Sequence, residues 1–214
     1  MARIVVLGGG AAGSNVANRL RRRFAAEIAA GVSTITVVDQ DDRHIFQPGL
    51  LFVPFGVYRA HDIVRPRRSQ LHPHITMRQA TVASLSLEAR QVLLTDGEPL
   101  AYDVCIVASG AVPAPEETEG LLGEAWRTSI FDFYSIDGAV ALAEMLATWR
   151  GGHLVVHVGD APIKGPLAPL EFAFLADWYF TMRGMRGEVD LTFVTSQDGP
   201  CAATACRQTL GALL

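Results

Sequence analysis

Apolar residues first gather in a short run at the start of the chain. Residues 3–7 read RIVVL and are followed at once by glycines. An unbroken run rich in β-branched side chains is typical of a strand buried on both faces of a parallel sheet. Apolar residues then recur at four-residue spacing, at Val16, Leu20, Phe24 and Ile28. This period predicts one long amphipathic helix after the strand.

A second apolar strand completes the first unit of the pattern. Gly31 is placed to end the helix, and residues 33–38 (STITVV) predict a strand that ends at Asp39. The order is therefore strand, helix, strand. The helix carries Arg19 and a run of arginines at 21–23, which we interpret as its solvated face.

The turn between this strand and helix contains the spacing G-x-G-x-x-G, formed by Gly8, Gly10 and Gly13. Glycines let the backbone approach a pyrophosphate, and the start of the helix offers free N–H groups to it. Asp39 ends the next strand, where a carboxylate can accept hydrogen bonds from a ribose. An ordinary glycine-rich turn is the alternative. The position of the motif between a strand and a helix favours a dinucleotide site.

The middle of the chain is richer in loops and prolines. Strand-like pieces at 75–85 and 90–95, around Asp96-Gly97, predict a small antiparallel layer. Residues 102–110 (YDVCIVASG) predict a further sheet strand that ends in a small-residue turn. Cys105 lies inside that strand, and we expect it to be a core residue.

The second half repeats the alternation of strand and helix. Residues 151–159 and 188–195 predict strands, and 169–183 predict an apolar-rich helix between them. We therefore expect an α/β protein with a Rossmann-like domain at 1–115 and part of a second such domain at 116–214. The apolar tail at 209–214 lacks a closing element, so we interpret the chain as one that stops within its second domain.

Composition excludes several classes of protein. Half of the 214 residues are hydrophobic and 19% are charged, which predicts a folded core. Eighteen basic and twenty-two acidic residues give a net charge of −4, which argues against nucleic-acid binding. No apolar run approaches the ~20 residues of a transmembrane helix. With only three cysteines and no export signal, the expected location is cytoplasmic.

The residue spacing argues against a metal site and against a second dinucleotide site in the second half of the chain. His153 and His157 are four apart on an expected strand, which separates them by ~13 Å, too far to share a metal. The segment after that strand, residues 159–162 (GDAP), does not repeat the glycine motif, and its proline removes an N–H group. NADH is therefore disfavoured as electron donor, and no metal site is expected.

Several segments together resemble the two-dinucleotide-binding-domain flavoproteins of the pyridine nucleotide-disulfide oxidoreductase family, and within it the sulfide:quinone oxidoreductase and flavocytochrome sulfide dehydrogenase group. The segments are GGGAAG at 8–13 with Asp39, HIFQPGL at 44–50, LAYD at 100–103 with VASGA at 107–111, and APIKGPLAPLEF at 161–172. The resemblance implies FAD as cofactor. The residues it implies for FAD binding are Gly8, Gly10, Ala11, Ala12, Gly13, Asp39, Gln40, Pro48, Ala108, Ser109 and Gly110.

The sequence departs from this family at two positions. Ser109 stands where threonine is usual. Gly165 stands where the resembling enzymes carry the first of two redox cysteines, and a glycine offers no nucleophile. Lys164 is a weak candidate for placing a charge near the flavin, and a surface role fits it equally well. Cys201 and Cys206 are expected to be bystanders.

The resemblance implies an oxidoreductase that passes two electrons from a reduced sulfur substrate through flavin to a quinone or cytochrome. It also implies peripheral docking on the inner membrane in a longer form. Two alternatives stay open: an NADH-dependent flavin reductase like type II NADH dehydrogenase, and a non-catalytic flavin-binding fragment. The sequence does not indicate an oligomeric state.

Overall fold

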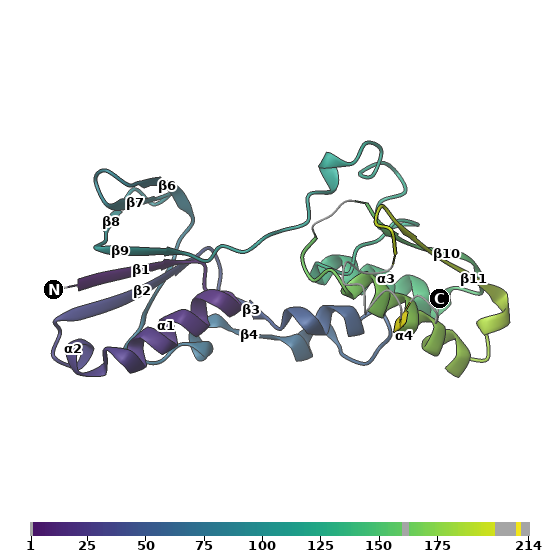
Figure 1. Cartoon of the computed structure of the whole chain (residues 1–214), viewed down its shortest axis with the longest axis horizontal. Helices are drawn as coiled ribbons and strands as arrows, with labels where there is room; N and C mark the ends of the chain where they lie inside the picture. Colours follow the sequence, from purple (N-terminus) through teal and green to yellow (C-terminus); the bar gives the residue numbers. More distant parts are fainter. Residues whose placement is uncertain (1, 160–162, 200–208, 211–214) are drawn as a thin grey trace. The chain divides into compact units, whose positions relative to one another are not determined.

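The computed structural model describes residues 2–159, 163–199 and 209–210, and these form two compact units. The first unit comprises residues 1–46 and 61–111, and the second comprises 47–60 and 112–214. Figure 1 labels the helices and strands of both units.

A parallel four-stranded sheet forms the centre of the first unit, in the order β5-β2-β1-β9. Its strands are β1 (Ala2–Leu7), β2 (Ser33–Asp39), β5 (Thr76–Gln79) and β9 (Val104–Val107). β1 pairs in parallel with both β2 and β9, and β2 with β5. The expected buried strand at the start of the chain is thus the centre of an open α/β sheet.

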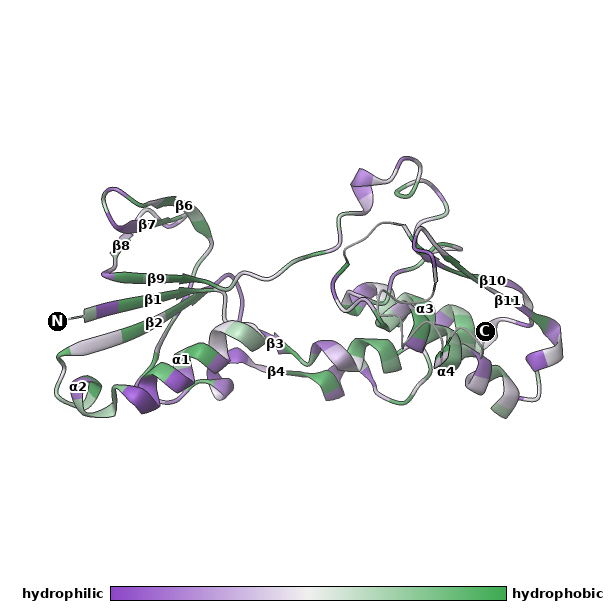
Figure 2. Ribbon diagram, in the orientation of Figure 1, coloured by the Kyte–Doolittle hydropathy of each residue, from purple (hydrophilic) through white to green (hydrophobic). Residues whose placement is uncertain are grey.

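Alternate residues of β1 pack into two different hydrophobic clusters. Ile4 and Val6 contact the layer that contains Ala17 of the first helix. Val5 and Leu7 contact the opposite layer, which contains Val92 and other residues of the antiparallel sheet. Because both faces of the strand are covered, its sequence is apolar at every position from 4 to 7. Figure 2 shows this hydrophobic centre in green.

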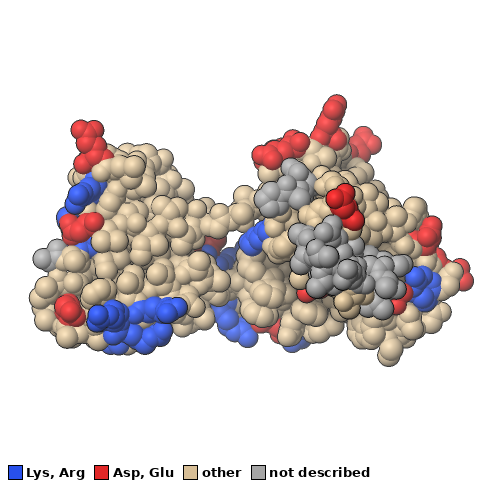
Figure 3. All heavy atoms as spheres, in the orientation of Figure 1, with Lys and Arg blue, Asp and Glu red and all other residues tan. Residues whose placement is uncertain are grey.

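The helix after β1 is shorter than its sequence pattern predicts. α1 (Ala11–Arg23) is capped by Phe24, whose φ and ψ of −112° and 36° are not helical. A separate short helix, α2 (Ala25–Ala29), follows. The four-residue spacing therefore describes two helices with a break rather than one long helix. The arginines of α1 gather at the surface of this unit (Figure 3).

The antiparallel layer forms, but over a shorter segment than expected. It consists of β6 (Val82–Ser86), β7 (Gln91–Leu94) and β8 (Pro99–Ala101). β5, which the sequence placed in the same layer, instead extends the parallel sheet. A separate antiparallel pair is formed by β3 (Arg43–Ile45) and β4 (Val64–Pro66).

The second unit contains two parallel strands and two long helices. They are α3 (Ile136–Thr148), β10 (Gly152–Val158), α4 (Ala168–Met182) and β11 (Val189–Thr195). Phe172 and Phe180 of α4 are almost fully buried in its core, which also takes in Leu51 and Phe55. Short 3-10 helices complete the two units: η1 (Gln47–Phe52), η2 (Ala60–Ile63), η3 (Arg67–Gln70), η4 (Pro115–Glu117) and η5 (Arg186–Glu188).

The expected α/β class, with a Rossmann-like parallel sheet and a small antiparallel layer, is confirmed. Among the described residues, no helix has the length and apolar character needed to cross a membrane.

Candidate nucleotide-binding site

The turn from β1 to α1 needs glycine at two positions for different reasons. Gly8 has φ = +96°, and a Cβ atom there would collide with the carbonyl oxygen of Ala108. A Cβ atom on Gly13 would collide with the carbonyl oxygen of Gly8. The first glycine therefore permits the turn, and the second lets α1 lie close against it.

Gly10 differs because its surroundings are open. It is the N-cap of α1, has no left-handed backbone, and a Cβ atom there would meet nothing within 4 Å. No side chain caps this end of α1, and its first turn contains no acidic residue. Ala11 and Ala12 are exposed beside it. The helix start is thus open to an anion, with N–H groups and a favourable dipole.

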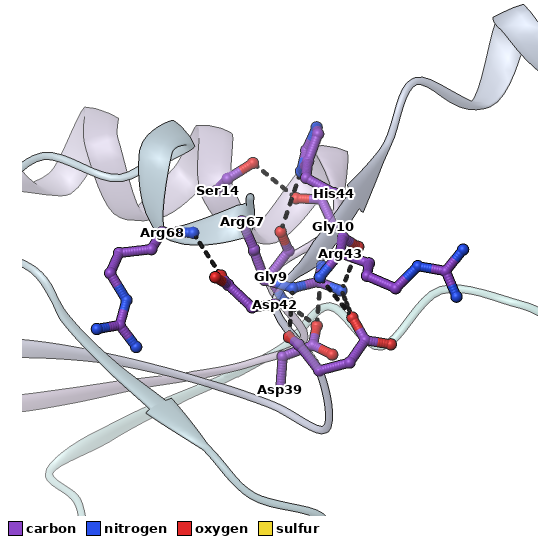
Figure 4. A network of polar contacts seen from close by, with 10 residues as sticks. Gly9, Gly10, Ser14, Asp39, Asp42, Arg43, His44, Arg67 and Arg68 are labelled. Atoms are coloured by element: carbon purple, nitrogen blue, oxygen red, sulfur yellow. Dashed lines mark hydrogen bonds and ion pairs between the residues drawn. The ribbon is translucent and has the colours of Figure 1, made fainter. Parts of the chain in front are cut away.

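Asp39 lies at the end of β2, next to this turn. Its Oδ2 atom accepts a hydrogen bond of 2.7 Å from the backbone N–H of Gly9. The same oxygen lies 3.1 Å from Nη1 of Arg67. Figure 4 shows these contacts. The carboxylate that the sequence assigned to a ribose is therefore held against the glycine turn, while Gln40 beside it is exposed.

Arg67 is the first residue of η3, and the sequence pattern does not reveal its place in this network. It is 7% exposed, and its guanidinium also contacts Asp41 and the carbonyl oxygen of Arg43. No local pattern marks it, because its partners lie 24 to 28 positions earlier in the chain. A second arginine beside it, Arg68, has an exposed side chain.

Two other polar contacts stabilise the same turn. The Ser14 hydroxyl donates a 2.7 Å hydrogen bond to the carbonyl oxygen of Gly10, and Nδ1 of His44 lies 3.4 Å from the carbonyl oxygen of Gly9. Both partners are backbone oxygens of the turn. These two contacts therefore leave the N–H groups at the start of α1 unused.

The small-residue turn after β9 lies beside the glycine turn. The backbone N–H of Ala108 donates a 2.7 Å hydrogen bond to the carbonyl oxygen of Leu7. A Cβ atom on Gly8 would collide with backbone atoms of Ala108 and Ser109. Gly110 follows, exposed and with φ = +76°. The structure thus brings Ala108 and Ser109 together with Gly8, although they are a hundred positions apart in the sequence.

Pro48 belongs to the second unit, on η1, and is exposed. The residues that follow it anchor this segment: Leu51 is buried, and the ring of Phe55 packs 5.0 Å from that of Phe172. The remaining expected FAD residues belong to the first unit.

Gly165 lies in the turn before α4. Its φ is +60°, it is exposed, and a Cβ there would have the Cβ of Ala168 as neighbour at 3.9 Å. The Tyr134 hydroxyl lies 3.4 Å from the Gly165 carbonyl oxygen. Burial, with Glu171 nearby, raises the pKa of Tyr134 to about 12, so this phenol remains a neutral hydrogen-bond donor. Lys164, which precedes Gly165 in the chain, has an exposed side chain.

The other reactive residues do not assemble into a site. Cys105 is half-buried against the antiparallel layer, less than the core position we expected, and burial raises the pKa of its thiol. His153 and His157 are exposed on β10, and no group of metal-ligating side chains occurs in the described part of the chain. Cys201 and Cys206 lie outside the described residues.

This geometry fits FAD on observations of the chain itself. The β1–α1 turn has an open helix start that could accept an anion, and an acid at the end of β2 lies against the same turn. A Cβ atom at Gly10 would enter the open space that a pyrophosphate needs. The glycine turn, the start of α1 and Asp39, which would hold the pyrophosphate and the ribose, therefore lie together in the first unit.

Comparisons with known proteins agree with this assignment. Residues 2–156 match the family described as pyridine nucleotide-disulphide oxidoreductase, and the chain belongs to that family. The family consists of FAD-binding flavoproteins, so the expected cofactor class is confirmed. Within it, the chain is similar to mitochondrial sulfide:quinone oxidoreductases. It is 26% identical to that of Dictyostelium discoideum over 89% of this chain and 41% of the relative. It is also 26% identical to that of Mus musculus, over 90% of this chain and 42% of the relative.

Solved structures show the same fold. The sulfide:quinone oxidoreductase of Aquifex aeolicus superposes with a TM-score of 0.80 at 20% identity, over 100% of this chain and 48% of that chain. A NAD-dependent persulfide reductase from A. fulgidus gives 0.60 at 20% identity, over 92% of this chain and 34% of that one. The chain therefore spans less than half the length of these relatives.

Proposed function

We propose that this chain is the FAD-binding part of an oxidoreductase of the sulfide:quinone type. The observation that carries the proposal is the β1–α1 turn with its open helix start and Asp39 against it. In this proposal, residues 1–115 form the FAD-binding domain and residues 116–214 belong to a second Rossmann-like domain. In the whole enzyme, electrons pass from a reduced sulfur substrate to a quinone or cytochrome.

Each residue has a definite task in this proposal. The N–H groups at the start of α1, at Ala11 and Ala12 beside Gly10, bind the pyrophosphate. Asp39 binds the ribose, and Gln40 lies next to it. Ala108, Ser109, Gly110 and Pro48 border the cofactor by resemblance to the family. When bound, FAD supplies a ring that accepts two electrons and passes them on.

Gly165 limits what these residues do in sulfur chemistry. A thiolate is needed to attack sulfur or be attacked by it, and neither Gly165 nor the neutral Tyr134 supplies one. Sulfide should therefore reduce flavin bound to this chain no faster than it reduces free flavin. The glycine at position 165 therefore also favours a second candidate function: a flavin-binding chain that does not oxidise sulfide by itself.

Anaerobic mixing of the FAD-loaded protein with sulfide, NADH or dithionite separates the candidates. We expect bleaching of the flavin band by dithionite, and sulfide and NADH rates equal to those of free FAD. Fast, saturable bleaching by sulfide would contradict the account of Gly165. Fast bleaching by NADH with none by sulfide would instead identify a nicotinamide-dependent flavin reductase. If sulfide does bleach the flavin quickly, Cys201→Ala and Cys206→Ala variants will show whether either cysteine has replaced the missing thiol.

A further inference from the structure

A buried arginine lies beside the acid assigned to the ribose. The Arg67 side chain is 8% exposed, with Nη1 3.1 Å from Oδ2 of Asp39 and Nη2 2.8 Å from Oδ1 of Asp41. Nε donates to the carbonyl oxygen of Asp41 at 3.1 Å, and Nη2 to that of Arg43 at 2.8 Å. The guanidinium therefore donates hydrogen bonds from Nε and Nη2, and its Nη1 forms an ion pair with Asp39 (Figure 4).

The aliphatic part of Arg67 is fixed by the glycine turn. A Cβ atom on Gly9 would lie 2.5 Å from Cδ of Arg67, so the arginine stem occupies the space that the missing side chain leaves. Arg67 thus connects the turn after β1, the end of β2 and the start of η3. A side chain held by packing and by fixed acceptors loses little further entropy when a ligand binds next to it.

This arrangement fixes which oxygen of Asp39 is used by the protein. The Gly9 N–H and the Arg67 guanidinium both contact Oδ2, and no hydrogen bond between described residues reaches Oδ1. Oδ1 is consequently the oxygen available to a ribose hydroxyl. Without Arg67, the carboxylate would keep the Gly9 contact but lose the charged partner that sets its orientation.

The chemistry of the pair also bears on ligand choice. An acid at this position binds a free ribose diol, whereas an arginine accommodates a 2′-phosphate. Here both are present, but the charge of Arg67 is neutralised by Asp39 and Asp41. A 2′-phosphate would meet two carboxylates and a guanidinium whose positive charge they already balance, which is unfavourable.

We propose, on the basis of the FAD-binding function above, that Arg67 is the positioning residue of the adenosine subsite. It turns Asp39 toward an unphosphorylated ribose and is itself masked from a 2′-phosphate by the two aspartates. The site therefore accepts nucleotides with a free ribose diol and rejects their 2′-phosphorylated counterparts. Removing the charge of Asp39 takes the carboxylate partner away from Nη1 of Arg67, while Asp41 still pairs with Nη2.

Calorimetric titration with ADP and 2′-phospho-ADP tests this without any redox activity. Wild type should prefer ADP by about tenfold or more, the scale of one charge-assisted contact. The nearly isosteric Asp39→Asn should shift the ratio of the two Kd values by at least about tenfold toward 2′-phospho-ADP. The double variant Asp39→Asn/Arg67→Met should lose that shift, because the cation that binds the phosphate is gone.

Arg78 provides a matched control in the same unit. It also contacts two acids, Asp96 at 2.5 Å and Glu98 at 2.8 Å, but it is 40% exposed. Arg78→Met should change neither Kd. Circular dichroism shows whether each variant is folded, and Asp39→Asn keeps the test usable if Arg67→Met unfolds the chain.

The outcomes separate the two proposals. If wild type binds ADP and Asp39→Asn keeps the wild-type ratio of Kd values, the masking of Arg67 is refuted while the nucleotide site stands. If wild type binds neither ADP nor FAD, the proposed function fails and this inference fails with it. A shift toward 2′-phospho-ADP that depends on Arg67 supports both.

Discussion

At the scale of single residues, Gly10 separates nucleotide binding from folding. A valine there meets no atom of the protein and requires no left-handed backbone, but its side chain enters the space expected for the pyrophosphate. We predict that Gly10→Val weakens FAD binding by at least about tenfold. The loss of folding stability should stay near or below ~1 kcal/mol, because valine is only a poorer N-cap than glycine. FAD titration and thermal melting measure the two effects.

The control for this substitution is Gly187→Val. Gly187 lies in η5 of the second unit, and a Cβ there also meets nothing within 4 Å without a left-handed φ. The control should bind FAD like wild type. Equal FAD affinity for Gly10→Val and wild type would remove Gly10 from the binding site.

The sequence identifies candidate site residues whose neighbours in the fold are also near in the chain. It does not identify residues whose contacts come from distant parts of the chain. Gly8, Gly13 and Asp39 could be chosen from spacing because a turn, a helix start and the end of a strand follow one another along the chain. Arg67 could not, since its acceptors come from the loop after β2 and only folding brings them near. Gly10 and Gly13 look alike in sequence, yet only the second is enclosed.

At the scale of elements, an exposed ion pair ties β1 to the start of β9. Asp103 accepts hydrogen bonds from the Arg3 backbone N–H at 2.7 Å and from Nη2 of Arg3 at 2.9 Å. The side-chain hydrogen bond from Arg3, with the backbone one, lowers the pKa of Asp103 to about 2. This pair joins the amino ends of β1 and β9, at the opposite end of β9 from the small-residue turn.

The lowered pKa predicts a pH-dependent loss of stability. A carboxyl with a lower pKa in the folded chain than in the unfolded chain stabilises the fold above its unfolded value of ~3.9. The contribution is lost as the pH falls toward about 2. Asp103→Asn should therefore melt at a lower temperature than wild type at pH 7, and the difference should shrink from pH ~4 downward. A difference in melting temperature that is constant from pH 7 to pH 3 would argue against the Arg3 contact as its source.

Elements were predicted well where burial on both sides gave a continuous apolar run, as in β1 and β2. They were predicted less well where periodicity alone was available. The four-residue spacing through Phe24 did not reveal the break between α1 and α2. Both helices place apolar residues against the same hydrophobic cluster, so the spacing continues across the break. β5 was assigned to the antiparallel layer because strand propensity does not reveal which neighbour a short strand will choose.

At the scale of the whole molecule, charge is divided unevenly between the two units. The first unit holds 11 of the 18 basic residues and 9 of the 22 acidic ones, so its formal charge is 11 − 9 = +2. The second therefore carries −4 − 2 = −6. The unit that contains the candidate site is the one whose net charge attracts a phosphate-bearing ligand, a weak long-range effect that salt should screen.

The central claim is that this chain binds FAD through the turn after β1. The most direct measurement is a titration of the purified, flavin-free protein with FAD, followed by the visible absorption of the flavin and by displacement with ADP. We predict saturable binding of one FAD per chain, competed by ADP and lost in Gly10→Val but kept in Gly187→Val. Absence of saturable binding, or binding that Gly10→Val leaves unchanged, would contradict the account.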